Sequence, residues 1–381
     1  MKRNKSFILI GIVSIVIALI FSYAGHFLFE PEPKPQKPII LKSPNTTEKK
    51  EKEISPVEYK HISTEIDGNK QEINILEIDL NSKKVRLEPI LSNDSTFGFE
   101  ELSSMSKRKN AYAAVNAGFF YEYGQPIGMV VINGQLVTAS TGKFPVFVFD
   151  GSKAGITQLK SELWLVLDGK KLKVTGINTP GKSGDVIVYT GEYGTTNRAK
   201  SSNFSIKVAN GVITETASLK GETDIPRNGF VVTFYGSAQR KPEISGLTAG
   251  ISLSLESIPA LNKDYQAYEC GSWVVRDGKS AVPARDDWVG VMTNYDPRTA
   301  IGIKYDGKVV LVTVDGRQPG YSTGFTGKEL AQYLIEYGVK DAAMLDGGAS
   351  TEMLIHDKLV NHPSFKGQER LLGGGLIIVV N

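Results

Sequence analysis

Val312-Thr-Val-Asp315-Gly-Arg317 and Ala343-Met-Leu-Asp346-Gly-Gly-Ala-Ser-Thr351 each end an apolar run with an aspartate followed by glycine. A strand that stops in this way exposes a carboxylate beside free backbone N–H groups. Between the two runs, residues 326–338 have a Thr/Glu capping box, an apolar face and a terminal glycine, which predict a helix. If both strands join one sheet, a crossover of this length makes them parallel. Asp315 and Asp346 are then expected at the same edge, where open α/β sheets bind ligands.

The Asp-Gly pair alone is weak evidence for a site. It also occurs at 67, 150, 168, 277 and 306, between strand-like runs, where a hairpin turn is the simplest interpretation. The pairs at 315 and 346 differ because a predicted helix separates them and because polar side chains follow them. Arg317 and the Ser350-Thr351 pair therefore become candidate functional residues.

Residues 1–29 have the pattern of a cytoplasmic stub and a membrane anchor. Basic residues at 2, 3 and 5 precede an apolar run from Phe7 to Phe29, which at about 1.5 Å per residue can cross roughly 30 Å of hydrocarbon. A small-x-small sequence occurs at Ser22-Tyr-Ala24, but the run continues beyond it, which favours an uncleaved anchor. The charge pattern then predicts a single-pass protein of the cell membrane with its larger part extracellular.

Residues 30–57 are rich in Pro, Lys, Glu, Ser and Thr, a composition that predicts a disordered linker. Residues 58–381 are expected to form the folded part, as one large domain or two intimate ones. The formal charge is +3, and Lys2, Arg3 and Lys5 account for it, so the exported part is neutral. That balance argues against a nucleic-acid partner.

Composition does not indicate a cofactor. The single cysteine, Cys270, is better explained as a small buried residue than as a nucleophile. The four histidines lack metal-ligand spacing, so no metal site is predicted, although a divalent ion among the carboxylates stays open.

Short runs rich in Val, Ile, Thr and Tyr alternate with turn residues along the folded part, and few helices interrupt them. Helices are expected at 99–109 and 328–337. Strands are expected at 73–80, 85–90, 111–115, 129–132, 145–149, 163–167, 186–189, 205–208, 229–235, 251–255, 300–305, 309–314, 342–345 and 376–380. We therefore expect an α+β fold with strand-rich mixed sheets.

Two further segments place polar side chains at turns. Asn116 follows an apolar run and precedes aromatics, which suits a sugar-binding amide but equally an ordinary turn. Arg298 stands just before a predicted strand, where a solvated arginine would be usual. Arg298 and Arg317 offer forks for phosphate, while Asp315 and Asp346 offer the carboxylate pair of glycoside hydrolysis. Neighbouring strands lie about 4.8 Å apart and next-nearest strands about twice that. This range includes the distances between the two carboxyl groups of both retaining and inverting glycosidases.

An ordered set of motifs resembles the phosphodiester glycosidase family. The motifs run from about residue 60 to 381 and are Asn116-Ala-Gly-Phe-Phe120, Ile225-Pro-Arg-Asn-Gly229, Pro297-Arg-Thr-Ala-Ile-Gly302, Val314-Asp-Gly-Arg317, Leu345-Asp-Gly-Gly-Ala-Ser-Thr351, Val360-Asn-His-Pro-Ser364 and Glu369-Arg370. The resemblance implies one strand-rich catalytic domain. It also implies a glycosidase that hydrolyses a sugar-1-phosphodiester at the anomeric carbon, releasing the sugar and a phosphomonoester.

The resemblance implies roles for particular residues. Asp346 is expected as nucleophile or general base, and Asp315 as its partner carboxylate or as the group that orients an arginine. The expected substrate-binding residues are Arg298, Arg317 and Arg370 for the phosphate, Asn116, Ser350 and Thr351 for sugar hydroxyls, and Thr299, Gly347, Gly348 and Glu369 around them. Ala349 and Asp296 depart from the family pattern, and are expected to narrow the cleft and to add negative charge near the phosphate.

Two rival interpretations remain open at this level. A non-catalytic module that binds a phosphorylated glycan and serves exopolysaccharide assembly would share the same motifs. A serine hydrolase using Ser350 would need a base, and His356 is near it in sequence only. The predicted extracellular location favours cell-envelope glycans as the carbohydrate phosphodiester.

Overall fold

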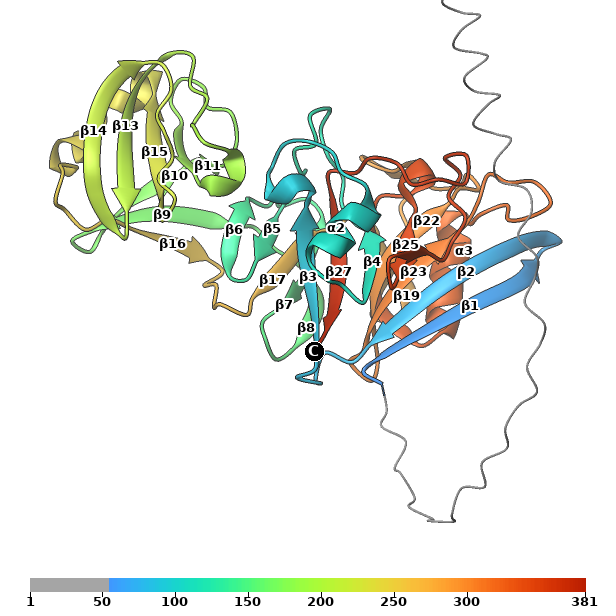
Figure 1. The fold of residues 1–381 in the computed structure, drawn as a ribbon. Coiled ribbons are helices and arrows are strands. Elements are labelled where there is room, and N and C mark those ends of the chain that lie inside the picture. The colour runs from blue at the N-terminus through green and yellow to red at the C-terminus, as the bar shows by residue number, and fades with distance from the viewer. Residues whose placement is uncertain (1–54) are drawn as a thin grey trace, which may run out of the picture. The chain divides into compact units, whose positions relative to one another are not determined.

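Strands are far more numerous than helices in the part of the chain that the structure describes, and they form several sheets around shared cores. The computed structural model describes residues 55–381, shown in colour in Figure 1. The predicted anchor and nearly all of the predicted linker lie outside these residues. Within 55–381, no helix combines the length and apolarity needed to span a membrane.

A seven-stranded sheet carries both carboxylate turns and has the order β1–β2–β23–β22–β24–β18–β19. Its strands are β1 (Val57–Ile66), β2 (Asn69–Ile78), β18 (Trp273–Arg276), β19 (Lys279–Ser280), β22 (Arg298–Lys304), β23 (Val309–Val314) and β24 (Val339–Met344). β23 and β24 both pair antiparallel with β22, so they run parallel to each other and end at the same edge. The predicted direction is confirmed, but the two strands are separated by β22 rather than adjacent.

The crossover between β23 and β24 is the helix α3 (Gly327–Glu336). Thr326 and Glu329 form the capping box expected from the sequence, with Thr326 accepting from the Glu329 N–H and Glu329 accepting from the Thr326 N–H. The apolar face of α3, including Leu330 and Leu334, packs against Val312 in the sheet. Figure 1 shows α3 lying against this sheet.

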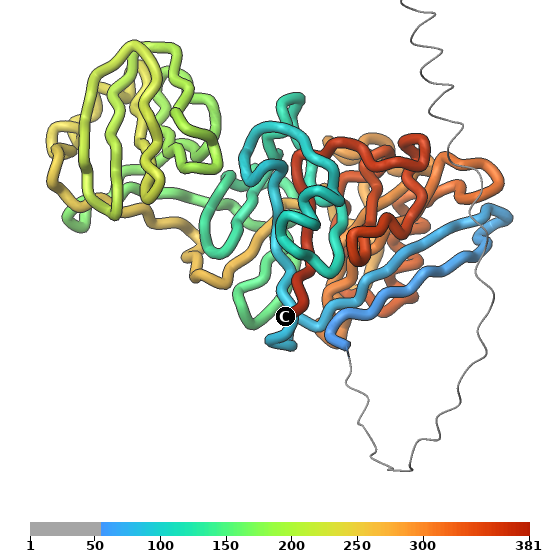
Figure 2. The backbone as a smooth tube through the Cα atoms, viewed as in Figure 1, coloured from blue at the N-terminus to red at the C-terminus, as the bar shows by residue number. Residues whose placement is uncertain are grey.

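A second sheet, of order β26–β25–β4–β27–β3, packs on the other face. Its strands are β3 (Val85–Leu91), β4 (Ala113–Asn116), β25 (Met353–Ile355), β26 (Lys358–Leu359) and β27 (Gly374–Val380). Val115 and Met353 from this sheet share one buried core with Leu345 and Leu311 from the first. The short helix α2 (Leu102–Arg108) covers the outer face of the second sheet. In Figure 2 the C-terminal segment runs beside the residues around 115, as the β4–β27 pairing requires.

The remaining strands form three further sheets and a hairpin, with another core between them. One sheet consists of β5 (Val130–Ile132), β6 (Gln135–Thr138), β7 (Pro145–Phe149), β8 (Ala154–Gln158) and β17 (Gln266–Glu269), and another of β9 (Glu162–Leu167), β10 (Lys170–Val174) and β16 (Ser254–Ile258). The last sheet consists of β11 (Gly176–Ile177), β12 (Val186–Tyr189), β13 (Ser202–Ala209), β14 (Val212–Lys220) and β15 (Gly229–Tyr235), and the hairpin of β20 (Arg285–Asp286) and β21 (Gly290–Val291). Short 3₁₀ helices are η2 (Ser92–Asp94), η3 (Gly191–Tyr193), η4 (Gly236–Arg240), η5 (Pro242–Gly246) and η6 (Gly348–Ser350).

The predicted fold class is confirmed for residues 55–381. Every predicted strand range overlaps an observed strand, and the two predicted helices match α2 and α3. The pair β11–β12 is parallel and belongs to an otherwise antiparallel sheet, which makes that sheet mixed. The strand β1 was not predicted, because its exposed face is polar.

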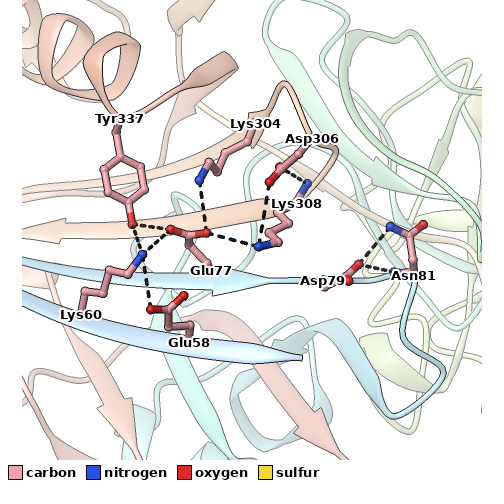
Figure 3. Close-up of polar contacts among 9 residues, drawn as sticks. All are labelled: Glu58, Lys60, Glu77, Asp79, Asn81, Lys304, Asp306, Lys308 and Tyr337. Carbon is pink, nitrogen blue, oxygen red and sulfur yellow. Dashed lines mark hydrogen bonds and ion pairs between the residues drawn. The ribbon is translucent and has the colours of Figure 1, made fainter. Parts of the chain in front are cut away.

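A buried acid joins β1 to the rest of the first sheet. Glu77 is 5% exposed and lies 2.7 Å from Lys60 Nζ, 3.2 Å from Lys304 Nζ and 2.5 Å from the Tyr337 hydroxyl. Figure 3 shows these side chains converging on Glu77 from β1, β22 and the end of α3, together with Lys308. Burial alone would raise the pKa of Glu77, but the hydrogen bonds from Lys60, Tyr337 and Lys304 outweigh it and lower the pKa to about 2.

Candidate active site at the end of β24

The topology brings three predicted residues to one edge of the first sheet. Asp315 follows β23 and Asp346 follows β24, while Arg298 opens β22, which runs between them in the opposite direction. Asn116, at the end of β4, reaches this edge from the second sheet, because its Nδ2 donates to the Asp346 carbonyl at 2.5 Å. The backbone N–H of Asp346 donates in turn to the Ala117 carbonyl at 2.7 Å. Both packed sheets therefore hold the turn that carries Asp346.

Asp346 has the environment of a functional carboxylate. Burial raises its pKa to about 6, against the opposing effects of a hydrogen bond from Ser350, the charge of Arg370 and the Gly347 N–H. At neutral pH this carboxylate is still mostly ionised, and it is more basic than an exposed aspartate. Such a group suits attack on an electrophilic carbon, or removal of a proton from water.

Arg370 approaches Asp346 through Ser350. Its Nη1 donates to Ser350 Oγ at 3.2 Å, and its guanidinium carbon lies 6.0 Å from the centroid of the Phe120 ring. The Arg370 N–H donates to Glu352 Oε1 at 2.6 Å, so the backbone of this residue is held as well as its side chain. A cation is thereby placed beside the most perturbed aspartate of this edge.

Glu352 was not predicted as part of the site. Its side chain is fully buried, and Oε2 has no hydrogen-bond partner among the described residues. Burial raises its pKa to about 8, which leaves the carboxyl largely protonated at pH 7. The one signal in the sequence is an acid placed directly before the apolar run Met353-Leu-Ile355, where a strand was not predicted.

Arg317 lies on the other side of the glycine turn. Its Nε donates to Asp296 Oδ1 at 2.8 Å, and about half of its side chain is exposed. A Cβ added at Gly348 would stand 3.3 Å from both Nη atoms of Arg317. Glycine at 348 therefore permits the close approach of the guanidinium. The negative charge of Asp296 is paired with Arg317, so it is not the unbalanced charge expected from the sequence.

Arg298 has a structural position instead of the phosphate contact expected from the sequence. It is 1% exposed, and its Nε and Nη2 donate to the Phe325 and Asn294 carbonyls, each at 2.8 Å. Desolvation by burial lowers its pKa from the usual arginine value. The guanidinium is therefore committed to main-chain oxygens beneath the edge.

Asp315 also has a buried, supporting position. Its carboxylate accepts from Asn361 Nδ2 and the His362 N–H, each at 2.8 Å, and from the Tyr321 hydroxyl at 3.3 Å. Burial raises its pKa, against those three hydrogen bonds. None of these contacts is with an arginine, so Asp315 does not orient one. Asp296, which accepts from Arg317 Nε, is the carboxylate that orients an arginine at this edge. Asn361 Nδ2 also donates to the Thr351 carbonyl at 3.0 Å, which links Asp315 to the segment after Asp346.

Several predicted sugar-binding groups are occupied within the protein. Asn116 Oδ1 accepts from Thr299 Oγ1 at 2.9 Å and from the Glu352 N–H at 3.0 Å, while Nδ2 is used by the Asp346 carbonyl. Asn116, Thr299 and Thr351 are all 1% exposed or less. These residues form a buried layer beneath Asp346 and position it.

Glu369 is occupied in a similar way. Its Oε1 accepts from the Ser103 N–H at 2.7 Å, in the first turn of α2. The predicted site therefore divides into two groups. Asp346, Gly347, Gly348, Ser350, Arg317 and Arg370 surround the glycine turn, and Asp315, Asn116, Arg298, Thr299, Thr351 and Glu369 support it.

Aromatic side chains lie next to the turn. The ring centroids of Phe119 and Trp288 are 4.9 Å apart, and those of Phe144 and Trp288 are 4.2 Å apart. A Cβ added at Gly271 would be 3.3 Å from the Phe119 ring and 3.2 Å from Met344 Cβ, which places these rings near the end of β24. Trp288 was not predicted, because nothing in its local sequence indicates a site. Within residues 55–381, no three His, Cys, Asp or Glu side chains group as metal ligands would.

The fold and the site together define a strand-rich domain with a carboxylate-glycine turn flanked by arginines. Residues 202–379 match the family model described as phosphodiester glycosidase, which confirms the resemblance noted in the sequence.

The chain is also similar to several curated proteins. An SPbeta prophage-derived protein of Bacillus subtilis, YomE, is 33% identical over 112 residues, covering 29% of this chain and 17% of the relative. An uncharacterized protein of Rickettsia conorii is 26% identical and covers 55% of this chain and 77% of the relative. The N-acetylglucosamine-1-phosphodiester alpha-N-acetylglucosaminidase of mouse is 28% identical, covering 39% of this chain and 27% of the enzyme. The matches to YomE and to the mouse enzyme thus span less than a third of those proteins.

Two solved structures share the fold. A hypothetical protein from Synechocystis superposes with a TM-score of 0.69 at 19% identity, covering 86% of this chain and 62% of that one. A putative exported protein of Burkholderia pseudomallei K96243 superposes with a TM-score of 0.64 at 23% identity, covering 82% of this chain and 74% of that one.

Proposed function

We propose that this protein hydrolyses a sugar-1-phosphodiester at the anomeric carbon. Water supplies a hydroxyl to the sugar, the bond between the anomeric carbon and the phosphate oxygen breaks, and the proton from water ends on solvent or on the phosphomonoester. The observation that carries the proposal is a carboxylate of raised pKa, Asp346, on a glycine turn that two arginines approach: Arg370 contacts Ser350, and Arg317 lies against Gly348. The family match supports the same chemistry.

The leaving group explains why arginines are needed. A phosphomonoester departs as a weakly basic anion, so stabilising its charge lowers the barrier more than protonating it does. Arg317 and Arg370 are the two arginines beside the turn whose forks are not wholly committed to main-chain oxygens. A guanidinium can make two parallel hydrogen bonds to a phosphate, which fixes its orientation as well as its charge.

Asp346 acts at the anomeric carbon, as nucleophile or as the base that activates water. Its raised pKa makes it a better base than an exposed aspartate while it stays largely ionised at neutral pH. The buried layer of Asn116, Thr299 and Thr351 fixes the backbone on which it stands. Holding a reacting group in one geometry is itself a large part of catalysis.

The proposed substrates are cell-envelope glycans with sugar-1-phosphate links, met on the extracellular side of the membrane. This part of the proposal is supported by the apolar run at 7–29 and the basic residues before it. Localising the intact protein by protease protection of whole cells tests it. Degradation of the folded part by external protease is expected, and full protection would contradict the assignment.

The test of activity compares wild type with Asp346→Asn, which keeps the shape and removes the charge. Wild type should release sugar from a panel of sugar-1-phosphodiesters, and the variant should lose at least about a hundredfold in kcat, within the range attributed to general acid–base groups. Glycan binding should survive in the variant. Binding without turnover by wild type would instead favour the non-catalytic phosphoglycan-binding module.

A further inference from the structure

A cavity lies on the sheet β11–β12–β15–β13–β14, and none of its lining residues belongs to the carboxylate edge. Its volume is ≈ 400 Å³, within the range usual for small-molecule sites. Along β12 and β15, alternate residues such as Val188 and Phe234 enter a core, whereas Tyr189 and Tyr235 point to the opposite face and line this cavity. Phe97 and Tyr193 complete an aromatic lining.

The mouth of the cavity holds an arginine whose charge is not paired. The Arg198 guanidinium carbon lies 4.2 Å from the Phe97 ring centroid and 5.5 Å from that of Tyr193. Its side chain makes no hydrogen bond or ion pair with any residue in 55–381, although most other arginines near acids, such as Arg317, do. Stacking on two rings holds the plane of the guanidinium while leaving its edge donors free.

A second cation and two hydroxyls complete the site. Lys200 is exposed, lines the same cavity and likewise has no partner within 55–381. The buried Tyr189 and Tyr235 hydroxyls lie 2.7 Å apart, and burial raises the pKa of both, so they stay protonated. The hydrogen bond between the two hydroxyls uses only one of their two protons. The other hydroxyl can therefore donate a hydrogen bond to a ligand.

Asp185 does not neutralise this site. Asp185 contributes to the rise in the pKa of Tyr189 and Tyr235, but its carboxylate accepts from the Lys182 N–H at 2.9 Å, and it does not line the cavity. An aromatic interior under two unpaired cations suits a ligand with a pyranose ring and an oxyanion. Rings pack against the C–H faces of sugars, and a guanidinium pairs with phosphate or carboxylate.

We propose that this cavity is a second glycan-binding site, which takes a sugar unit carrying an oxyanion, with Arg198 on the anion and the aromatic lining against the sugar ring. The site is independent of hydrolysis at Asp346. In an enzyme that acts on an anionic polymer, it would hold a sugar unit distant from the bond being cleaved.

Isothermal titration calorimetry at low salt tests the proposal with four probes: glucose 6-phosphate, glucuronate, inorganic phosphate and glucose. These probes contain no phosphodiester, so turnover does not enter the measurement. Wild type should bind glucose 6-phosphate or glucuronate more tightly than phosphate or glucose, because both halves of the site are then used. Preference between the first two tells which oxyanion the site accepts. Absence of measurable binding by any probe overturns the proposal.

Variants locate the binding. Arg198→Ala should weaken binding by about tenfold or more, as expected for the loss of a charge-assisted contact. The matched control is Arg276→Ala, which also removes an arginine stacked on an aromatic ring, 5.1 Å from the Trp273 centroid, and should bind normally. Thermal unfolding of each variant shows whether it is folded. If binding survives in Arg198→Ala but is lost in Arg370→Ala, the anion lies at the carboxylate edge and the proposal is wrong.

Discussion

The guanidinium of Arg317 lies so close to Gly348 that a Cβ added at that glycine would be 3.3 Å from both of its Nη atoms. Gly348 also has φ +60°, a conformation that costs a side chain about 1 kcal/mol or more. Two separate constraints therefore require glycine in the turn that follows Asp346. The first of them depends on Arg317, which follows β23 and lies 31 positions earlier in the chain.

Gly348→Ala should lower kcat/KM for a sugar-1-phosphodiester by displacing Arg317, and should reduce the free energy of unfolding by about 1 to 2 kcal/mol. Steady-state kinetics and thermal unfolding measure the two effects. Gly221→Ala is the control, since that glycine has open space around its Cβ position and an ordinary φ. Unchanged kinetics in Gly348→Ala would remove Arg317 from the phosphate site.

The two arginines of the edge should respond differently to substitution. Arg317→Lys keeps the charge but loses the planar fork, so KM should rise severalfold with little change in stability. Arg298→Lys should mainly destabilise the protein, because the Phe325 and Asn294 carbonyls lose buried donors at a cost of about 1–3 kcal/mol. Steady-state kinetics and chemical denaturation, both measured on each variant, distinguish the effect on substrate binding from the effect on stability. An unchanged KM and kcat in Arg317→Lys would count against its proposed role.

The pKa of about 6 for Asp346 gives activity and stability opposite pH dependences. Activity that needs the carboxylate should rise with pH through about 6. The folded-state pKa lies above the usual value of 3.8, so the folded protein binds more protons and stability falls as pH rises from about 4 through 6. Asp346→Asn should therefore be more stable at pH 7, by at most about 3 kcal/mol. Lower stability of that variant at pH 7, with a normal circular dichroism spectrum, would contradict the assignment of the pKa.

Glu352 should behave as a neutral residue at pH 7. Its pKa is raised from 4.5 to about 8, so stability from the protonated form is complete below about 4.5 and is lost as pH rises through 8. Glu352→Gln should flatten that dependence and keep activity, because the amide oxygen can still accept from the Arg370 N–H. Glu352→Ala should lower kcat by releasing Arg370. Urea denaturation from pH 5 to 9 checks the stability prediction, and equal activity of the Gln and Ala variants would exclude a positioning role.

Glu77 should stabilise the protein down to acid pH. Its pKa is lowered to about 2, so its contribution is present above the usual value of 4.5 and is lost as pH falls through 2. Glu77→Gln should reduce the free energy of unfolding by about 1 to 3 kcal/mol at pH 7. This is less than the loss expected on breaking a fully buried ion pair, because the three lysines are partly exposed. Glu256→Gln, which removes a half-exposed partner of Lys171, is the control and should change stability little. A loss of the same size in both variants would mean that burial of Glu77 adds nothing.

Local patterns were sufficient for much of the fold. The capping box of Thr326 and Glu329, the apolar face of α3 and the glycine at 338 specify a helix through contacts within one turn or two. That helix in turn required β23 and β24 to run in the same direction, and both carboxylate turns do reach one edge. The order of strands across the sheet was not predictable in this way. β22 lies between β23 and β24 because it pairs with both of them, and no local pattern in the sequence indicates these pairings.

The roles of individual side chains were harder to predict, since burial depends on those distant segments. Arg298 looks like a phosphate-binding residue in the sequence, yet the loop that contains Asn294 and the residue Phe325 enclose it. Asp315 has the same local motif as Asp346, but Asn361 and His362, from near the C-terminus, cover it. Glu352 has no recognisable motif, and its importance comes from Arg370.

By itself, then, the sequence determined the helix, the directions of the strands around it and the two carboxylate-glycine turns, because capping, periodicity and glycine act over a few residues. Only the tertiary structure decided which carboxylate is flanked by arginines and which is buried as a support. Desolvation and the approach of charges depend on the side chains that surround a group, and those come from segments that no local pattern connects.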